Sequence, residues 1–134
     1  MSAFFWIGLI IVVQILVWGG ASAVGQYVIQ LAKLSGLQVV TTASPKNTSL
    51  LLSMGADIVF DYRDAEVVAK IREFTSNKLR YAIDCVSAGD TPKLIGQCLG
   101  SSGGYVGCVL VAPIPRPDVT SEFVLVYTLL GKAS

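Results

Sequence analysis

Apolar residues occur along this chain in short blocks that have two different spacings. Residues 15–19 form a continuous apolar run closed by glycine, which is typical of a buried parallel strand. In residues 22–35 the apolar side chains recur every three or four positions, which is the spacing of one face of an α-helix. Residues 37–43 are rich in β-branched side chains and predict a second strand. The first third of the chain therefore predicts a strand–helix–strand unit.

The alternation continues through the rest of the chain. A short helix is predicted after Pro45, and longer helices begin near Asp64 and Thr91, with Glu66 and Lys70 expected to pair across one helical turn. Further strands are predicted at 57–61, 81–86, 104–110 and 122–130, with a proline-rich loop at 112–117. Strands that alternate with helices across short connections predict an α/β fold, a doubly wound parallel sheet covered on both faces.

A long apolar stretch precedes the first predicted strand. Only two residues interrupt the apolar side chains between positions 3 and 18, and the first charged residue is Lys33. A membrane span needs about 20 apolar residues, and this stretch reaches that length only by including the glycines at 19–25. We therefore expect an apolar leader at 1–14 and one domain at 15–134, with a membrane anchor through 3–25 as the alternative.

Composition removes several classes of function. The 134 residues allow one compact domain, and a net charge of +1 without a basic run gives no footprint for nucleic acid or for an anionic membrane surface. The chain has three cysteines without C-x-x-C spacing and no histidine, so no metal site is expected. We expect the cysteines to be reduced thiols in the core of a cytoplasmic protein.

The turn WGGASAVG joins the first strand to its helix and carries the candidate chemistry. A dinucleotide pyrophosphate requires a turn without bulky side chains, so that backbone N–H groups at the helix N-terminus reach its oxygens. Gly19, Gly20 and Gly25 meet this requirement, and Ser22 replaces the middle glycine of the usual pattern with a hydroxyl that is a candidate phosphate donor. The alternative is an ordinary tight turn.

The end of the second strand indicates which dinucleotide is bound. NAD enzymes place an acidic residue there on the ribose 2′-hydroxyl, but the first acidic residue of this chain is Asp57. The strand instead leads into Ser44, Pro45, Lys46 and Asn47, a set of donors with one cation that suits a 2′-phosphate. NADP(H) is therefore the expected cofactor. The alternative is that Ser44 and Asn47 cap the next helix and Lys46 is a surface charge.

Six blocks in order resemble the medium-chain dehydrogenase/reductase superfamily, and within it the fungal trans-acting enoyl reductases of polyketide biosynthesis: LVWGGASAVG, QLAKLSG, TTASPKN, GADIVFDYRD, KLRYAIDCV and PRPDV. The resemblance implies a Rossmann-type cofactor domain that is incomplete at both ends. It implies that Ala21, Ser22, Ala23 and Val24 lie on the pyrophosphate, that residues 44–47 and Tyr62 hold the 2′-phosphate, and that Val109 and Leu110 lie near the nicotinamide.

The resemblance also implies hydride transfer from NADPH to an α,β-unsaturated thioester, with a polyketide synthase or an acyl-carrier-bound substrate as partner. Residues 1–14 do not resemble the GroES-like domain that forms most of the substrate pocket in this group. We therefore expect a fragment that is inactive in isolation, and the alternative is a nucleotide-binding remnant without turnover. The proton donor stays unassigned, because Tyr81, Tyr105 and Tyr127 all fall in predicted strands.

Overall fold

The computed structural model describes residues 13–108 and 115–123. Six strands are present in this part of the chain: β1 (Gln14–Trp18), β2 (Gln38–Ala43), β3 (Ile58–Asp61), β4 (Tyr81–Asp84), β5 (Gly104–Cys108) and β6 (Val119–Phe123). The helices are α2 (Ala23–Leu34), the 3₁₀ turn η1 (Pro45–Asn47), α3 (Thr48–Ser53), α4 (Val67–Phe74) and α5 (Thr91–Cys98). Helices and strands alternate as the hydrophobic pattern predicts.

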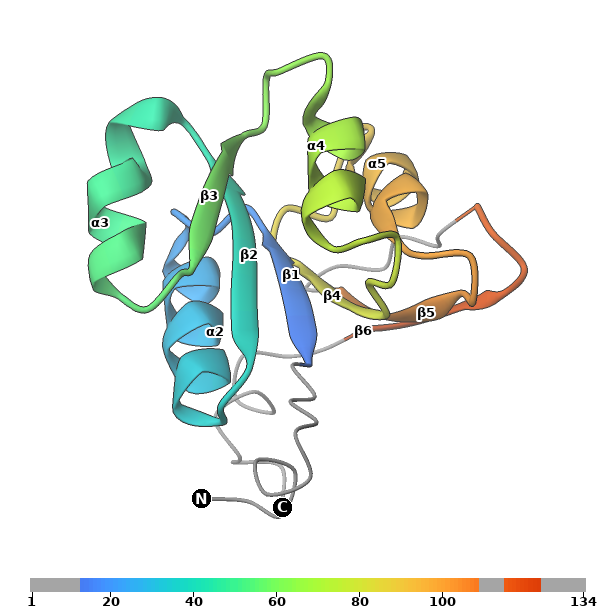
Figure 1. The fold of residues 1–134 in the computed structure, drawn as a ribbon, viewed down its shortest axis with the longest axis horizontal. Coiled ribbons are helices and arrows are strands. Elements are labelled where there is room, and N and C mark those ends of the chain that lie inside the picture. The colour runs from blue at the N-terminus through green and yellow to red at the C-terminus, as the bar shows by residue number, and fades with distance from the viewer. Residues whose placement is uncertain (1–12, 109–114, 124–134) are drawn as a thin grey trace.

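The strands form one parallel sheet in the order β3-β2-β1-β4-β5-β6 (Figure 1). This order reverses direction between β1 and β4, and such a switch point is where open α/β sheets bind ligands at the carboxyl ends of the strands. The register aligns those ends, because Trp18 of β1 lies opposite both Thr42 and Asp84. The predicted doubly wound α/β class is confirmed.

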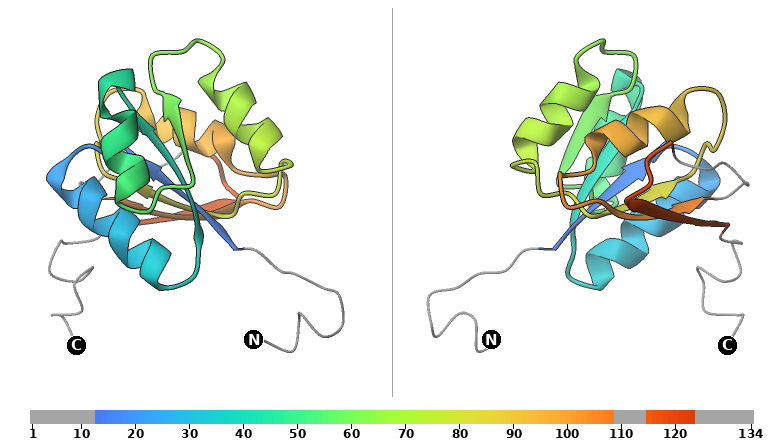
Figure 2. Two further views of the ribbon diagram at one scale, coloured as in Figure 1. Left: turned by 60° about the vertical axis from the view of Figure 1, so that its left-hand side comes forward. Right: turned by 90° about the vertical axis from the view of Figure 1, so that its right-hand side faces the viewer.

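The two faces of the sheet carry separate hydrophobic cores. Helices α2 and α3 lie on one face, and α4 and α5 lie on the other (Figures 1 and 2). Side chains alternate along β1, so that Val17 packs with the α2 and α3 side, whereas Leu16 and Trp18 pack with the α4 and α5 side. A strand with both faces buried reads as a continuous apolar run, which explains the sequence of β1.

Strand ends differ from the prediction by one or two residues in β1, β2, β3 and β4, and by three residues at the start of β6. β1 begins at Gln14, one residue early, because its backbone already pairs with β2 at Gln38, whose N–H donates to the Val13 carbonyl at 2.9 Å. The Gln14 side chain also donates from Nε2 to Oε1 of Gln38 at 2.6 Å. β6 begins at Val119 rather than at residue 122, and residues 124–130 of the predicted strand lie outside the described part. The apolar pattern therefore placed the start of β6 too far toward the C-terminus.

The start of α4 corrects a second prediction. The helix begins at Val67, and the Asp64 carboxylate accepts the Glu66 backbone N–H at 2.8 Å in the preceding turn. Lys70 forms its ion pair with Asp64 and not with Glu66. The predicted pair one helical turn apart is therefore wrong, because Glu66 precedes the helix and Asp64 lies within reach of the lysine.

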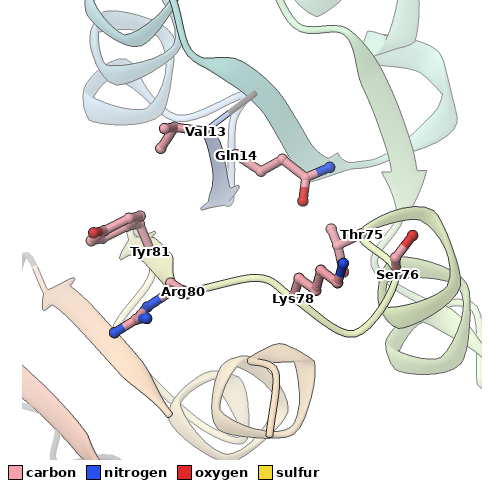
Figure 3. A pocket seen from close by; sticks show the side chains of 7 residues that line it. All are labelled: Val13, Gln14, Thr75, Ser76, Lys78, Arg80 and Tyr81. Atoms are coloured by element: carbon pink, nitrogen blue, oxygen red, sulfur yellow. The ribbon is translucent and has the colours of Figure 1, made fainter. Parts of the chain in front are cut away.

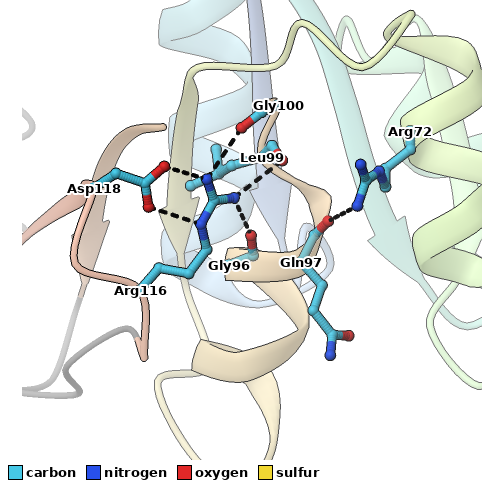
Figure 4. A network of polar contacts seen from close by, with 7 residues as sticks. All are labelled: Arg72, Gly96, Gln97, Leu99, Gly100, Arg116 and Asp118. Carbon is cyan, nitrogen blue, oxygen red and sulfur yellow. Dashed lines mark hydrogen bonds and ion pairs between the residues drawn. The ribbon is translucent and has the colours of Figure 1, made fainter. Parts of the chain in front are cut away.

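Arg116 ties the loop before β6 to the end of α5 (Figure 4). Its guanidinium donates to the backbone oxygens of Gly96, Leu99 and Gly100 at 2.9 to 3.2 Å and to both carboxylate oxygens of Asp118. The last carbonyls of a helix have no partner within the helix, and Arg116 supplies one here. The PRPDV block thus has a structural role in this fold.

No helix in the described part of the chain is long and apolar enough to cross a membrane. Among the described residues of the apolar stretch, 14–18 form β1 and α2 starts at Ala23.

Candidate functional site

A cavity of about 270 Å³ opens at the carboxyl ends of β1 and β2, beside the switch point of the sheet. Four segments contribute to its wall: the turn after β1, the end of β2 with η1, the residue after β3, and the loop after β4. The lining residues are Trp18, Gly19, Ala21, Ser22, Thr42, Ala43, Ser44, Asn47, Tyr62, Val86 and Thr91. Six of these, namely Gly19, Ala21, Ser22, Ser44, Asn47 and Tyr62, were candidates from the sequence.

The glycine turn lies directly against β2. The backbone N–H of Gly19 donates to the Thr42 hydroxyl at 3.1 Å, and that of Gly20 donates to the Thr42 carbonyl at 3.0 Å. A Cβ atom at Gly20 would lie 2.2 Å from the Thr41 hydroxyl oxygen, and one at Gly25 would lie 2.3 Å from the Gly19 carbonyl oxygen. The close approach of α2 to the turn therefore requires glycine at both positions, which agrees with the glycine roles of a dinucleotide-binding turn.

Ser22 has a different role from the one that its hydroxyl suggested. The hydroxyl donates to the Gly19 carbonyl at 2.9 Å and accepts the Gly25 backbone N–H at 3.0 Å, so Ser22 is the N-cap of α2. Because a serine hydroxyl has a single proton, it does not also donate to a phosphate in this arrangement. Ser22 thus fixes the position of the helix N-terminus.

The first turn of α2 presents backbone donors beside this cavity. The first N–H groups of an α-helix have no intrahelical partner, and Ala23 and Val24 occupy that turn. The turn contains no acidic residue. Backbone donors and the positive end of the helix dipole together favour an anion, so this helix end fits a pyrophosphate.

The segment after β2 forms η1, and its polar side chains are not used as caps. Ser44 is the N-cap residue of η1 and Asn47 that of α3, yet neither makes a side-chain capping hydrogen bond. The capping alternative is therefore wrong for both residues. Lys46 is exposed within η1 and makes no ion pair with any described residue, and Pro45 starts the turn.

Tyr62 closes the cavity on the side of β3. It follows Asp61, which lies opposite Ala43 in the register of β2 and β3, so Tyr62 and Ser44 leave neighbouring strands at the same level. The Tyr62 hydroxyl accepts a hydrogen bond from Arg63 Nε at 3.1 Å, and this bond and the nearby Ser44 hydroxyl lower the pKa of Tyr62 below its ordinary value. The structure thus brings together Ser44 and Tyr62, which the sequence proposed separately.

The loop after β4 is the part of the site that the sequence did not reveal. Asp84 is fully buried, accepts the backbone N–H groups of Val86 and Ser87 at 3.0 and 2.7 Å, and accepts the Thr91 hydroxyl at 3.0 Å. These bonds hold Val86 and Thr91 in the cavity wall. The only signal in the sequence was an acidic residue within the apolar run YAIDCV. Val109 and Leu110, the candidates for the nicotinamide end, lie outside the described residues.

A larger cavity of about 580 Å³ lies at the opposite edge of the sheet, at the amino ends of β1 and β4 (Figure 3). Its wall includes Gln14, Ser76, Lys78, Arg80 and Tyr81. Ligands of open parallel sheets bind at the carboxyl ends of the strands, and none of the predicted site residues lines this cavity. The smaller cavity is therefore the candidate site.

No group of three or more histidine, cysteine, aspartate or glutamate residues in the described part of the chain is arranged to hold a metal ion. Cys85 and Cys98 are free and buried, which confirms the prediction of core thiols for these two. Burial raises the pKa of each thiol to about 12.

These pKa values predict unreactive cysteines. At pH 8 a thiol with a pKa near 12 is almost entirely protonated, and only the thiolate is nucleophilic. We expect Cys85 and Cys98 to remain unmodified by iodoacetamide in the folded protein at pH 8 and to react after denaturation, as followed by peptide mass spectrometry. Rapid native labelling of either thiol would contradict the buried placement.

Comparison with known proteins identifies the family to which this site belongs. The family model described as zinc-binding dehydrogenase matches residues 23–128. The chain belongs to this family. Its members are medium-chain dehydrogenases/reductases, so the resemblance seen in the sequence is confirmed.

Individual family members support the same assignment. A trans-enoyl reductase of Gibberella zeae is 44% identical over 125 residues, which is 90% of this chain and 34% of that protein. A trans-enoyl reductase of Alternaria alternata is 45% identical over 119 residues, covering 88% of this chain and 35% of that protein. This chain therefore spans about a third of these relatives. The fold matches Escherichia coli quinone oxidoreductase complexed with NADPH with a TM-score of 0.72 at 19% identity, over 97% of this chain and 47% of that one.

Proposed function

We propose that this chain binds NADP(H) in the cavity at the carboxyl ends of β1 and β2, as the cofactor domain of an enoyl reductase-type oxidoreductase. The observation that supports this most strongly is that Ser44 and Tyr62, from the ends of neighbouring strands, line the same cavity wall, in which no described residue is acidic. Lys46 follows Ser44 in η1 and forms no ion pair with any described residue. A ribose 2′-phosphate finds donors and a cation there, whereas a free 2′-hydroxyl finds no carboxylate.

Different residues of the chain have different roles in the proposed cofactor binding. The α2 N-terminus at Ala23 and Val24, positioned by the Ser22 cap, binds the pyrophosphate through backbone N–H groups. Gly20 and Gly25 allow the close packing that brings this helix end to the edge of the sheet. When bound, NADPH supplies the hydride, and the protein contributes orientation and electrostatics.

The substrate proposal follows the relatives. Proteins with which this chain shares 44 to 45% identity are named trans-enoyl reductases, so we infer that the complete protein reduces an α,β-unsaturated thioester delivered by a polyketide synthase or acyl carrier in the cytoplasm. Tyr62 is the only titratable residue in the described cavity wall, and it lies at the 2′-phosphate end of the proposed site. The 134-residue polypeptide by itself should therefore bind NADPH without consuming it in the presence of a crotonyl thioester.

A graft tests the enoyl reductase proposal directly. Residues 15–123 of this chain would replace the matching segment in one of the fungal relatives, and NADPH oxidation with a crotonyl thioester would be followed at 340 nm. Retained turnover supports the proposal. A hybrid that folds and binds NADPH but no longer reduces the thioester would contradict it.

Removal of Lys46 tests the placement of the 2′-phosphate. We expect Lys46→Ala to weaken NADPH binding by roughly ten-fold and to leave NADH binding unchanged, because a hydrogen bond to a charged group contributes about 1.5–3 kcal/mol and only NADPH carries the extra phosphate. Fluorescence titration of both cofactors provides the measurement.

The matched control for this variant is Lys78→Ala, which removes the same charge at the opposite edge of the sheet (Figure 3). This change should leave both affinities close to those of the wild type. Equal losses for NADPH and NADH in Lys46→Ala would mean that the lysine supports the pyrophosphate or the fold, and the 2′-phosphate assignment would then fall.

A further inference from the structure

Arg63 lies at the edge of the proposed 2′-phosphate site but was not among the residues that the sequence singled out. Its backbone N–H donates to the Asp61 carboxylate at 2.9 Å, which forms a tight turn after β3. Its side-chain Nε donates to the Tyr62 hydroxyl at 3.1 Å, and the guanidinium carbon lies 5.3 Å from the centroid of the Tyr62 ring. The turn and the ring together hold the guanidinium beside the cavity wall.

Most N–H donors of the Arg63 guanidinium have no hydrogen-bond partner among the described residues. A guanidinium has five N–H donors, and only Nε has a hydrogen-bond partner among the described residues. The two terminal nitrogens form a flat pair of donors, and such a pair matches two oxygens of a phosphate. The side chain is exposed, so a ligand reaches it without displacing core residues.

The two carboxylates nearest to Arg63 in the sequence each have a hydrogen-bond partner other than its guanidinium. Asp61 accepts the Arg63 backbone N–H through Oδ1, and Asp64 forms an ion pair with Lys70. Within residues 13–108 and 115–123, Arg63 forms no ion pair of its own. An arginine without a carboxylate partner, fixed beside an anion site, is a cation available to a ligand.

We propose that Arg63 is a specificity-determining residue of the cofactor site, which binds the phosphate monoester on the adenosine ribose through its terminal nitrogens while Tyr62 holds the guanidinium in place. This inference rests on the proposed NADP(H) site and extends it. A phosphate monoester carries about −1.5 to −2 charges at pH 7, so one lysine leaves charge uncompensated. Arg63 and Lys46 follow the carboxyl ends of two neighbouring strands, β3 and β2.

The test compares three single variants of the full chain by titration with NADPH, NADH and adenosine 2′,5′-bisphosphate at low ionic strength. Arg63→Gln should lower the affinity for NADPH and for the bisphosphate by roughly ten-fold and leave the affinity for NADH unchanged. Arg63→Lys should recover only part of this loss, because an ammonium keeps the charge but lacks the flat pair of donors. Arg80→Gln removes an exposed arginine at the opposite edge of the sheet and should change none of the three affinities.

The role of Tyr62 is tested by coupling. If Tyr62 positions the guanidinium, Tyr62→Phe combined with Arg63→Gln should weaken NADPH binding by less than the product of the two single losses. Independent losses would show that Tyr62 binds the phosphate by itself and would overturn the positioning role.

Two further results separate this inference from the proposal on which it rests. If wild type binds NADPH selectively but Arg63→Gln loses no more affinity than Arg80→Gln, the Arg63 inference is overturned and the NADP(H) site stands. If wild type binds neither dinucleotide, the proposed function and the inference fall together. Melting temperatures close to wild type in all variants would confirm that binding, and not folding, is measured.

Discussion

Ser44→Asp is expected to reverse the cofactor preference from NADPH to NADH. The new carboxylate would lie at the cavity wall beside Tyr62, where we place the 2′-phosphate. The affinity for NADPH should fall by about a hundredfold, because a charge-assisted hydrogen bond is lost and two like charges come close together. The same carboxylate accepts a hydrogen bond from a free ribose hydroxyl, so NADH should bind several-fold more tightly.

Two controls separate charge from shape in this experiment. Ser44→Asn has a side chain of similar size without charge and should lose much less NADPH affinity than Ser44→Asp. Ser76→Asp adds the same charge at the far cavity of Figure 3 and should leave both cofactors unaffected. Should Ser44→Asp bind NADPH as tightly as Ser44→Asn does, the phosphate does not lie beside Ser44.

Gly25→Ala is expected to destabilise the fold and to abolish most cofactor binding. Alanine is favoured over glycine inside a helix by about 1 kcal/mol, so the substitution would be stabilising if space allowed. Here the added methyl group would lie 2.3 Å from the Gly19 carbonyl oxygen and 2.7 Å from the Gly20 Cα atom, which are backbone atoms. Overpacking costs about 1–3 kcal/mol and occasionally more, so after the helix-propensity gain is subtracted we expect a net loss of up to about 2 kcal/mol.

The measurement for Gly25→Ala is urea unfolding together with NADPH titration. Gly36→Ala is the matched control, because Gly36 has a φ of +84° and an added Cβ meets no atom within 4 Å. The free energy of unfolding of that variant should fall only by the cost of a left-handed backbone conformation, about 1–2 kcal/mol. Its NADPH affinity should stay at the wild-type value. Stability equal to or above wild type in Gly25→Ala would show that α2 does not pack against the turn as described.

Most of the fold was predictable because both faces of the sheet are buried. The apolar run within β1 and the helical spacing in α2 are direct consequences of that burial. The start of β6 was missed because its residues 120–122 are polar, and β6 lies at the edge of the sheet formed by the described residues, where polar side chains are tolerated. The start of β1 at Gln14 follows from backbone pairing with Gln38 on β2, and hydrophobic periodicity does not reveal such pairing at a polar residue.

The candidate site was predictable where backbone geometry dictates the residue type. Gly20 and Gly25 have no room for a side chain, and that constraint is visible in the sequence. The role of Ser22 was not, because a hydroxyl can donate to a ligand or to a carbonyl, and only the fold selects Gly19. Asp84 was overlooked because its three hydrogen-bond donors come from a loop and a helix start that are placed by tertiary packing.

The most direct test of the central claim is isothermal titration of the wild-type chain with NADPH and NADH under identical low-salt conditions. We predict saturable binding of NADPH that is at least roughly ten-fold tighter than that of NADH, since the phosphate contributes at least one charge-assisted interaction. Binding of NADH as tight as that of NADPH, or no binding of either cofactor, would contradict the proposed NADP(H) site.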